Sequence, residues 1–134
     1  MKPQWIDYRA WHHDKKVMMH VSEIDFRKER VKGRAKDEVI VARFDEVVLM
    51  PWTTYYDDDD VMIYEGDIVE VTRKYMKKRF VIDDEMGVLL ARCIADDLYP
   101  FVTFDLEMLI DDNGRIKVIG NAYENPELLE KKEV

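Results

Sequence analysis

The sequence predicts a mainly β fold with minor helix, and two features carry this prediction. Short runs of β-branched and aromatic residues recur along the 134-residue chain, and several alternate in the period of two that is typical of strands. Turn-forming pairs such as Gly66-Asp67 and Asn113-Gly114 separate these runs. A chain of this length, with 47% hydrophobic residues, is expected to bury a core as one domain, or as one small domain with an extension.

The N-terminal part predicts a series of short strands. Residues 4–12 hold two tryptophans and a tyrosine, which predict a strand or an ordered segment laid across the core. Residues 17–21 follow a period of two and predict a second strand. Two more strands are expected at residues 39–44 and 47–50, the latter ended by Pro51.

Two charged segments of this part are expected to be exposed. Residues 25–38 are rich in Lys and Arg, and their sparse apolar residues show no clear period, so we expect a connection or a hairpin tip. Residues 57–60 are four consecutive aspartates, which predict a solvated loop. This run lacks the ligand spacing of a calcium-binding loop.

Residues 63–71 predict a tight turn that opens a strand. Gly66 can adopt the positive φ that a type II or primed turn needs, and Asp67 can accept hydrogen bonds from nearby backbone groups. The β-branched residues after the turn suit a pleated strand, on which Val69 and Val71 share one face.

Further strands are expected downstream, followed by a short helix. The predicted strands are residues 67–74, 78–82, 88–95, 101–104 and 115–121. Residues 106–110 fit either a strand or a helical turn, and Asn113-Gly114 predicts a type I′ hairpin. Asn125 is expected to cap the helix, with Pro126 at its first position and its end near residues 131–132.

The charge balance argues against two classes of partner. The chain has 29 acidic and 21 basic residues, a net charge of −8, which disfavours a general nucleic-acid coat and an anionic membrane surface. Cys93 is the only cysteine and predicts a small buried hydrophobe in a reducing compartment. With neither a signal-like apolar run nor a span of about 20 apolar residues, the protein is expected to be soluble and cytoplasmic.

No set of residues predicts catalysis, a metal or a cofactor. His12, His13 and His20 lack metal-ligand spacing, because adjacent histidines on a strand point to opposite faces. Ser22 is the only serine, and it lacks the turn on which nucleophilic serines sit. We therefore expect a protein that is not an enzyme and that needs no cofactor.

The basic stretch is the one candidate nucleic-acid surface. If the fold brings Trp52, Tyr55 and Tyr56 close to it, cations and aromatic rings would form such a surface, and small barrels often bind nucleic acid. The acidic total charge and the lack of aromatic residues interleaved with the cations argue for the alternative, a solvated charged hairpin. The candidate contacts are Arg27, Lys28, Arg30, Lys32, Arg34 and Lys36.

Two blocks of the chain, residues 63–69 (IYEGDIV) and 118–129 (VIGNAYENPELL), resemble the hallmark blocks of the YopX protein family. Residues 8–11 (YRAW) resemble the aromatic-Arg-Ala-Trp opening of that family, and residues 49–57 resemble the segment before its second block. Residues 51–54 (PWTT) depart from the usual Gln-Tyr-Thr-Gly, and Asp58-Asp59-Asp60 replaces a glycine-containing turn. These departures affect local turns more than the fold. The family's motif maps here onto Tyr64, Gly66, Asp67, Gly120, Asn125 and Pro126.

The resemblance implies a fold and an origin. It implies an SH3-like small β-barrel in residues 63–134, with residues 1–62 as a β-rich segment packed on it. It also implies a phage- or prophage-encoded protein in the cytoplasm of a bacterial host. The family has no established activity, so it assigns no catalytic residues. We expect a protein-interaction or regulatory module that binds a host or phage protein, with self-association as a further expectation. The alternative is a nucleic-acid-binding small barrel.

Overall fold

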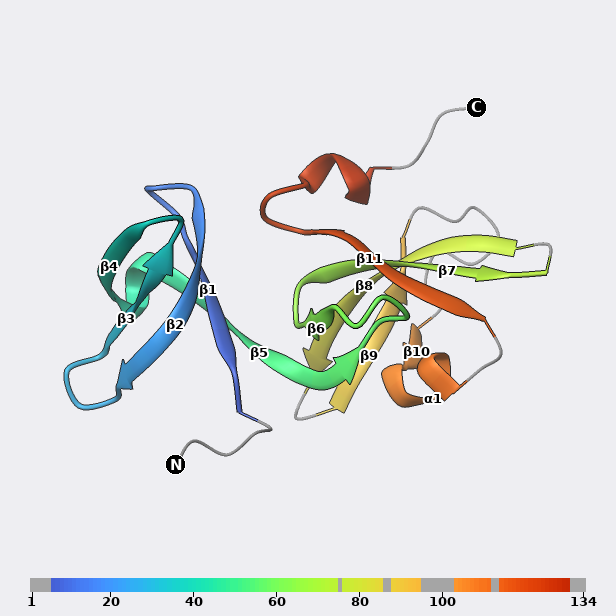
Figure 1. Ribbon diagram of the computed structural model, residues 1–134, viewed down its shortest axis with the longest axis horizontal. Coiled ribbons are helices and arrows are strands. Elements are labelled where there is room, and N and C mark those ends of the chain that lie inside the picture. The colour runs from blue at the N-terminus through green and yellow to red at the C-terminus, as the bar shows by residue number, and fades with distance from the viewer. Residues whose placement is uncertain (1–5, 75, 86–87, 95–102, 112–113, 131–134) are drawn as a thin grey trace. The chain divides into compact units, whose positions relative to one another are not determined.

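Strands dominate the structure, as the sequence predicts (Figure 1). The computed structural model describes residues 6–74, 76–85, 88–94, 103–111 and 114–130. Contacts between residues divide the chain into two compact units, Met1–Thr54 and Tyr55–Val134. The boundary predicted from the sequence lies further along, at residue 62.

The first unit is built on antiparallel strands that follow each other along the chain. Their sheet has the order β4-β3-β2-β1-β5-β6. Its core is made by the residues on one face of each strand, mostly small or β-branched, so that neighbouring strands pack closely. The strands of this sheet are β1 (Tyr8–His12), β2 (Val17–Asp25), β3 (Arg30–Ala35), β4 (Glu38–Arg43), β5 (Val47–Tyr56) and β6 (Met62–Tyr64), with the 3₁₀ helix η1 (Phe44–Glu46) before β5. Strand β6 and the last two residues of β5 belong to the second unit.

The basic stretch is not merely a connection, because strand β3 occupies its second half. Val31, Gly33 and Ala35 are buried, and the other three residues of the strand are exposed. These are Arg30, Lys32 and Arg34. Turns occur in this stretch only on either side of β3, at residues 26–29 and 36–37. The alternation is present in the sequence, but its buried face carries a glycine and an alanine, which do not stand out as apolar.

Pro51 was expected to end the strand that begins at residue 47. Strand β5 instead continues through Pro51 to Tyr56. Trp52 donates its N–H to the carbonyl of Asp7 at 2.8 Å. Alternate residues of an antiparallel strand bond to the same neighbour, so the nitrogen of Pro51 faces away from β1. The missing N–H therefore costs no hydrogen bond to β1, and the strand tolerates the proline.

The second unit contains an antiparallel sheet of order β10-β9-β8-β7-β11. Its core includes Ile63, Val69, Val71 and Phe80, and Cys93 is buried there as predicted. In the part of the chain that the structure describes, no pairing joins the first and last strands of either sheet. The SH3-like barrel therefore stays a prediction. The strands are β7 (Asp67–Arg73), β8 (Met76–Glu85), β9 (Val88–Cys93), β10 (Thr103–Asp105) and β11 (Arg115–Asn121).

The helical elements of the second unit are short. The ambiguous residues 106–110 form the helix α1 (Leu106–Asp111). The expected C-terminal helix is a four-residue 3₁₀ helix, η2 (Pro126–Leu129), and its expected end at residues 131–132 lies outside the described residues. The type I′ turn predicted at Asn113-Gly114 includes a residue outside the described part. Of the strand predicted at residues 101–104, the first two residues lie outside the described part and the last two belong to β10.

Candidate functional site

The two hallmark blocks of the sequence lie side by side in the second unit. Strand β7 begins in the first block and pairs antiparallel with β11, which ends in the second block. Asp67 is the register partner of Asn121, and Ile68 is that of Gly120. Figure 1 shows β11 (orange-red) running beside β7 (green-yellow). The motif residues therefore form a single cluster rather than two separate features.

The first block forms the predicted turn. Glu65 and Gly66 occupy the two central positions of the turn. Only Gly66 has a positive φ, of 87°, which fits a type II turn. The buried carboxylate of Asp67 accepts a hydrogen bond from the N–H of Tyr64 at 2.7 Å. Gly66 donates its N–H to Ile82 at 2.8 Å and accepts from Ala122 at 2.9 Å. These contacts tie the turn to β8 and to the chain after β11.

The second block closes a compact loop on itself. The side-chain oxygen of Asn121 accepts from the N–H groups of Tyr123 and Glu124, at 3.0 and 2.8 Å. Asn125 precedes η2, but its side chain makes no cap hydrogen bond, contrary to the expectation; its Oδ1 accepts from the N–H of Asn121 at 3.2 Å. Pro126 opens η2 as predicted.

Gly120 makes this loop sterically feasible. A Cβ at this position would lie 2.6 Å from Oδ1 of Asn125, far inside van der Waals contact. The side chains of Asp67, Asn121 and Asn125 thus accept hydrogen bonds from backbone groups of the same two blocks, and this arrangement explains why the fold requires them.

The aspartate run is not the fully solvated loop that the sequence predicts. Asp57 is only 5% exposed. Its Oδ1 accepts from the N–H groups of Asp59 and Val61, at 2.8 and 2.9 Å, and its Oδ2 accepts from the N–H of Val118 at 2.9 Å. Oδ2 of Asp58 accepts from the N–H of Ile116 at 2.6 Å. The two carboxylates thus pair with the side of β11 that faces away from β7.

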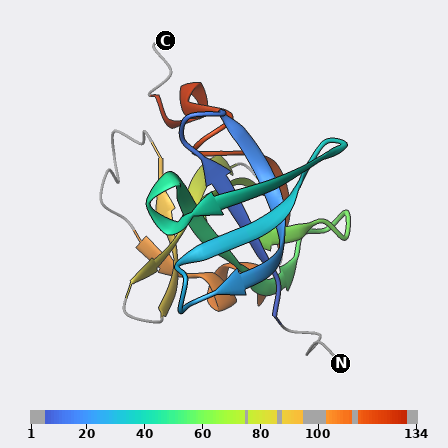
Figure 2. The same cartoon turned by 90° about the vertical axis from the view of Figure 1, so that its left-hand side faces the viewer.

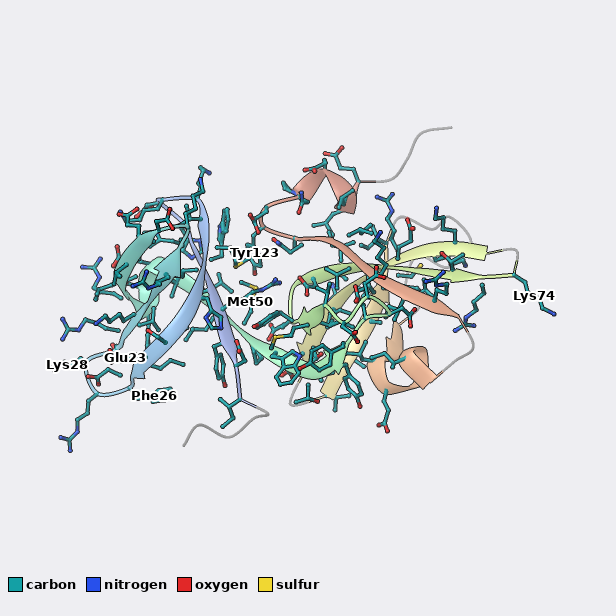
Figure 3. The ribbon with its side chains drawn as sticks, in the orientation of Figure 1. Glu23, Phe26, Lys28, Met50, Lys74 and Tyr123 are labelled. Atoms are coloured by element: carbon teal, nitrogen blue, oxygen red, sulfur yellow. The ribbon has the colours of Figure 1, made fainter. Side chains whose placement is uncertain are left out.

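The predicted nucleic-acid contacts are spread over one hairpin and the turn that follows it. Arg27 and Lys28 lie in the β2–β3 turn, where Figure 3 shows Lys28 near Phe26 and Glu23. Lys36 lies in the β3–β4 turn with φ 57°. The remaining three, Arg30, Lys32 and Arg34, alternate along the exposed face of β3. Only these three share one strand face, and we call them the cation row.

Acidic side chains flank one part of the cation row. On β2, Asp25 is the register partner of Arg30, and Glu23 is that of Lys32. The amide of Lys28 contributes most to holding the pKa of Asp25 below its ordinary value, aided by the charge of Arg30. The N–H groups of Arg27 and Lys28 both bond to Oδ1 of Asp25 at 3.0 Å. The hairpin is therefore close to charge-balanced on its β2 side.

On the other side of the cation row lies β4, which is the end strand of its sheet (Figure 2). Its outward-facing residues Val39 and Val41 are 49% and 58% exposed. They are the register partners of Arg34 and Lys32. A basic row and an apolar edge thus adjoin on one sheet face.

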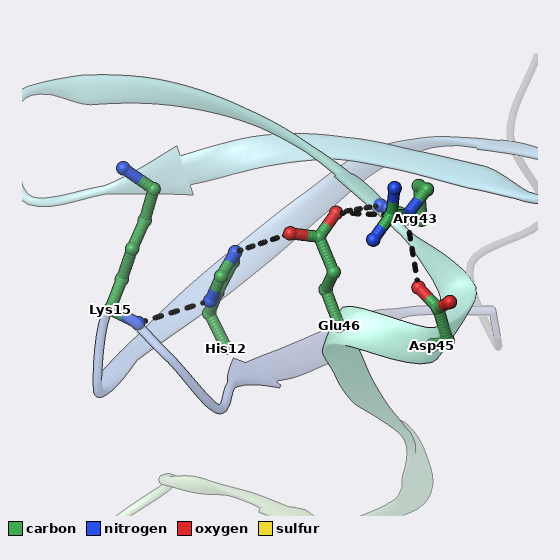
Figure 4. A network of polar contacts seen from close by, with 5 residues as sticks. All are labelled: His12, Lys15, Arg43, Asp45 and Glu46. Carbon is green, nitrogen blue, oxygen red and sulfur yellow. Dashed lines mark hydrogen bonds and ion pairs between the residues drawn. The ribbon is translucent and has the colours of Figure 1, made fainter.

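The histidines are held in separate contacts. His12 is buried, accepts the N–H of Lys15 on Nδ1 at 3.1 Å and points Nε2 toward Glu46 at 3.8 Å (Figure 4). His20 is exposed and contacts Asp7 through Nε2 at 3.0 Å. His13 is exposed in the turn after β1. Within the described residues, no group of three or more His, Cys, Asp or Glu is placed to hold a metal ion.

One groove brings together residue types that could resemble a hydrolytic site. It is lined by Asp7, His20 and Ser22 together with apolar side chains of β1 and β2. Ser22, however, donates its hydroxyl to the carbonyl of Lys32 at 3.1 Å, and among the described residues no hydrogen bond joins it to His20. A serine committed to a backbone carbonyl has no base to activate it.

In the part of the chain that the structure describes, no helix has the length and apolarity that crossing a membrane requires.

Comparison with known proteins identifies the family. The family model described as YopX protein matches residues 7–130. Protein EF1440 from Enterococcus faecalis has a similar solved structure, with 24% sequence identity and a TM-score of 0.60, covering 93% of this chain and 98% of its own. Protein yopX from Bacillus subtilis has 21% identity and a TM-score of 0.61, covering 92% of this chain and 98% of its own.

At these identities the two structures show a shared fold and nothing about activity. None of the curated proteins matches the chain. The family model, in contrast, covers nearly the whole sequence, including both hallmark blocks. The protein therefore belongs to the YopX family.

Proposed function

We propose that this protein acts by binding another protein, as an interaction or regulatory module encoded by a phage or prophage and working in the bacterial cytoplasm. The observation that carries the proposal is the sheet face on which the cation row adjoins the exposed valines of the end strand β4. Protein partners commonly use exposed strand edges and mixed apolar and charged surfaces of this kind. The phage origin rests on the resemblance of this sequence to the YopX family, which is found in phages and prophages.

A binding role also agrees with how the polar side chains are used. The hallmark residues and Asp57 direct their polar atoms to backbone groups of the same unit. His20 contacts Asp7, and Ser22 donates its hydroxyl to the carbonyl of Lys32, so the two side chains do not act on each other. A catalytic site needs a nucleophile, a base and a stabilising donor that converge, and these side chains do not supply them.

The experiment places a photo-crosslinking amino acid at position 41 in cells that carry the phage or prophage. The same amino acid at position 129, which is also a partly exposed apolar residue in the second unit, serves as the control. A discrete protein adduct formed from position 41 and absent from position 129 supports the proposal. A failure to form any discrete adduct, from these positions or from a scan of the exposed positions of both units, contradicts it.

A second candidate function, nucleic-acid binding, is favoured by the cation row alone. Three cations on one strand face can contact successive phosphates. The neighbouring Glu23 and Asp25 and the net charge of −8 weigh against it. Reversing the charges of Arg27, Lys28, Arg30 and Lys32 should abolish binding to DNA or RNA that weakens with added salt. If the parent protein shows no retardation of either nucleic acid at low salt, this candidate is wrong.

A further inference from the structure

Among the residues that the structure describes, no strand pairs with the outer side of β4, which therefore presents a short stretch of free edge. The β3–β4 hairpin turns through Lys36 and Asp37, so Ala35 and Glu38 form the hydrogen-bonded pair next to a two-residue turn. Hydrogen-bonded and non-hydrogen-bonded pairs alternate from there. Ile40 therefore bonds to β3, whereas Val39 and Val41 direct their N–H and C=O groups away from it.

The two ends of this free edge are closed. Arg43 follows the same alternation and should also face outward, and its N–H indeed bonds to Oε1 of Glu46 at 2.9 Å. Figure 4 shows Glu46 and Asp45 of η1 folded back onto Arg43. At the other end the chain turns at Lys36. The open part of the edge is thus centred on Val39 and Val41.

This edge lacks the usual protection against strand pairing. Exposed edges are normally guarded by lysines, prolines or bulges. The β3–β4 register runs without a shift, and the two outward side chains in the middle of β4 are uncharged valines. Such an edge is a template for an incoming strand, which would bond to four backbone groups and cover two apolar side chains.

The cation row selects the chemistry of the incoming strand. Arg34 lies behind Val39 and Lys32 behind Val41, on the same exposed face. Lys32 has Glu23 as its β2 partner, but the β2 partner of Arg34 is His20, which already contacts Asp7. An added strand would lie about 10 Å from β3, two strand spacings, which long side chains can bridge across a valine. A shallow hollow on the same face is lined by Arg30, Lys32 and Val41 and also by the carboxylates of Glu23 and Asp25, so the cation that is left to the incoming strand is Arg34 more than Arg30 or Lys32.

We propose that β4 binds an extended acidic peptide segment of a partner protein as an additional strand. Its backbone pairs with Val39 and Val41, and its acidic side chains reach Arg34 and Lys32. A nucleic acid would meet the cations but leave the strand edge and both valines unused. A second copy pairing through β4 would bring two cation rows onto one face, where like charges repel. The inference rests on the proposed binding function and names the surface and the partner's chemistry.

Labelled peptides of roughly seven residues, a usual strand length, provide the test. One peptide alternates Glu with Val, a second alternates Lys with Val, and a third is the acidic peptide with methylated backbone nitrogens. Fluorescence anisotropy should show binding of the acidic peptide alone. Methylation should abolish binding, because it removes the N–H groups that an added strand must donate.

Two variants and two controls locate the site. Val41→Glu places on the edge a charge that repels an acidic strand and should abolish binding, whereas Val88→Glu, at another half-exposed valine, should not. Arg34→Glu should weaken binding about tenfold or more, as expected for a lost charge-assisted contact. Lys74→Glu makes the same kind of charge change at an exposed position of the second unit (Figure 3) and should leave binding intact. Near-ultraviolet circular dichroism and thermal melting verify that each variant is folded.

Several outcomes would overturn the inference. These are acidic-peptide binding weaker than about 1 mM, equal binding of the basic peptide, and binding that survives in folded Val41→Glu. Binding of single-stranded DNA that depends on Arg34, without peptide binding, would assign the face to nucleic acid instead. Self-association lost in Val41→Glu, again without peptide binding, would assign it to a second copy. If crosslinking identifies a partner elsewhere on the chain while these peptide tests fail, the binding function stands and only this surface is wrong.

Discussion

Oδ2 of Asp57 accepts a hydrogen bond from the N–H of Val118 at 2.9 Å, across 61 positions of sequence. Its other oxygen accepts from Asp59 and Val61, so a single buried carboxylate holds both its own turn and the outer side of β11. Asp58 repeats the contact at Ile116. The aspartate run thus supplies acceptors for outward-facing N–H groups of β11, as a neighbouring strand would, and it shields the outer edge of β11 from pairing with another strand.

Asp57→Ala is expected to lower the free energy of unfolding by about 3 kcal/mol, because it leaves buried N–H groups without an acceptor. Urea unfolding of parent and variant measures the difference. Asp59→Ala is the matched control, since its side chain is exposed and the change there should stay within about 0.5 kcal/mol. Equal effects of the two substitutions would show that the Asp57 contacts contribute nothing specific.

Gly66→Val is expected to destabilise the protein by roughly 2 kcal/mol or more, because a β-branched residue is strained at φ 87°. Gly66→Asn should cost clearly less, since asparagine tolerates positive φ. Thermal melting ranks the three proteins. A Gly66→Val protein that melts like the parent would show that the turn does not require glycine.

Glu65→Gln is expected to change how stability depends on pH. Burial, and secondarily the charge of Asp84, raises the pKa of Glu65 above its ordinary value of 4.5. A raised pKa in the folded state means that this group's stabilising contribution is present below the unfolded pKa and is lost as pH rises through the folded pKa. The parent should therefore lose stability relative to Glu65→Gln above about pH 4.5.

The size of this effect should be a few tenths of a kcal/mol, because Glu65 is partly exposed and solvent screens its charge. Urea midpoints of the parent and Glu65→Gln, measured from acidic to neutral pH, give the curve. Glu127→Gln, at an exposed glutamate, is the control. If the difference between Glu65→Gln and the parent is the same at every pH, burial does not perturb this carboxyl group.

Gly120→Ala is expected to cost about 1–3 kcal/mol, because the added Cβ displaces Asn125 from its bond to the Asn121 N–H. Asn125→Ala removes the same bond by another route. The double substitution should therefore cost less than the sum of the two single ones, by about 0.5 kcal/mol or more. A double-mutant cycle on unfolding free energies measures this coupling, and strict additivity would mean that the two residues act independently.

Local chemistry allowed part of the fold to be predicted. Gly66 and Asp67 predicted their turn because positive φ and a short acceptor side chain are properties of single residues. The strand β3 was missed although its alternation is visible, because Gly33 and Ala35 occupy its buried face. The strand β5 was expected to stop at Pro51, because the sequence cannot show that the nitrogen of Pro51 faces away from the neighbouring strand β1.

The sequence by itself determined the mainly β class, the turn at Gly66 and the membership of the YopX family, because each depends on short sequence patterns that can be recognised without knowing which segments pair. Tertiary structure decided the rest. It buried Asp57 by bringing it to Val118, and it joined the two hallmark blocks at Asp67 and Asn121. It also placed the valines of β4 on a free edge beside Arg34. Strand order and register fix these relationships, and both arise from pairing between distant segments, which local sequence patterns do not encode.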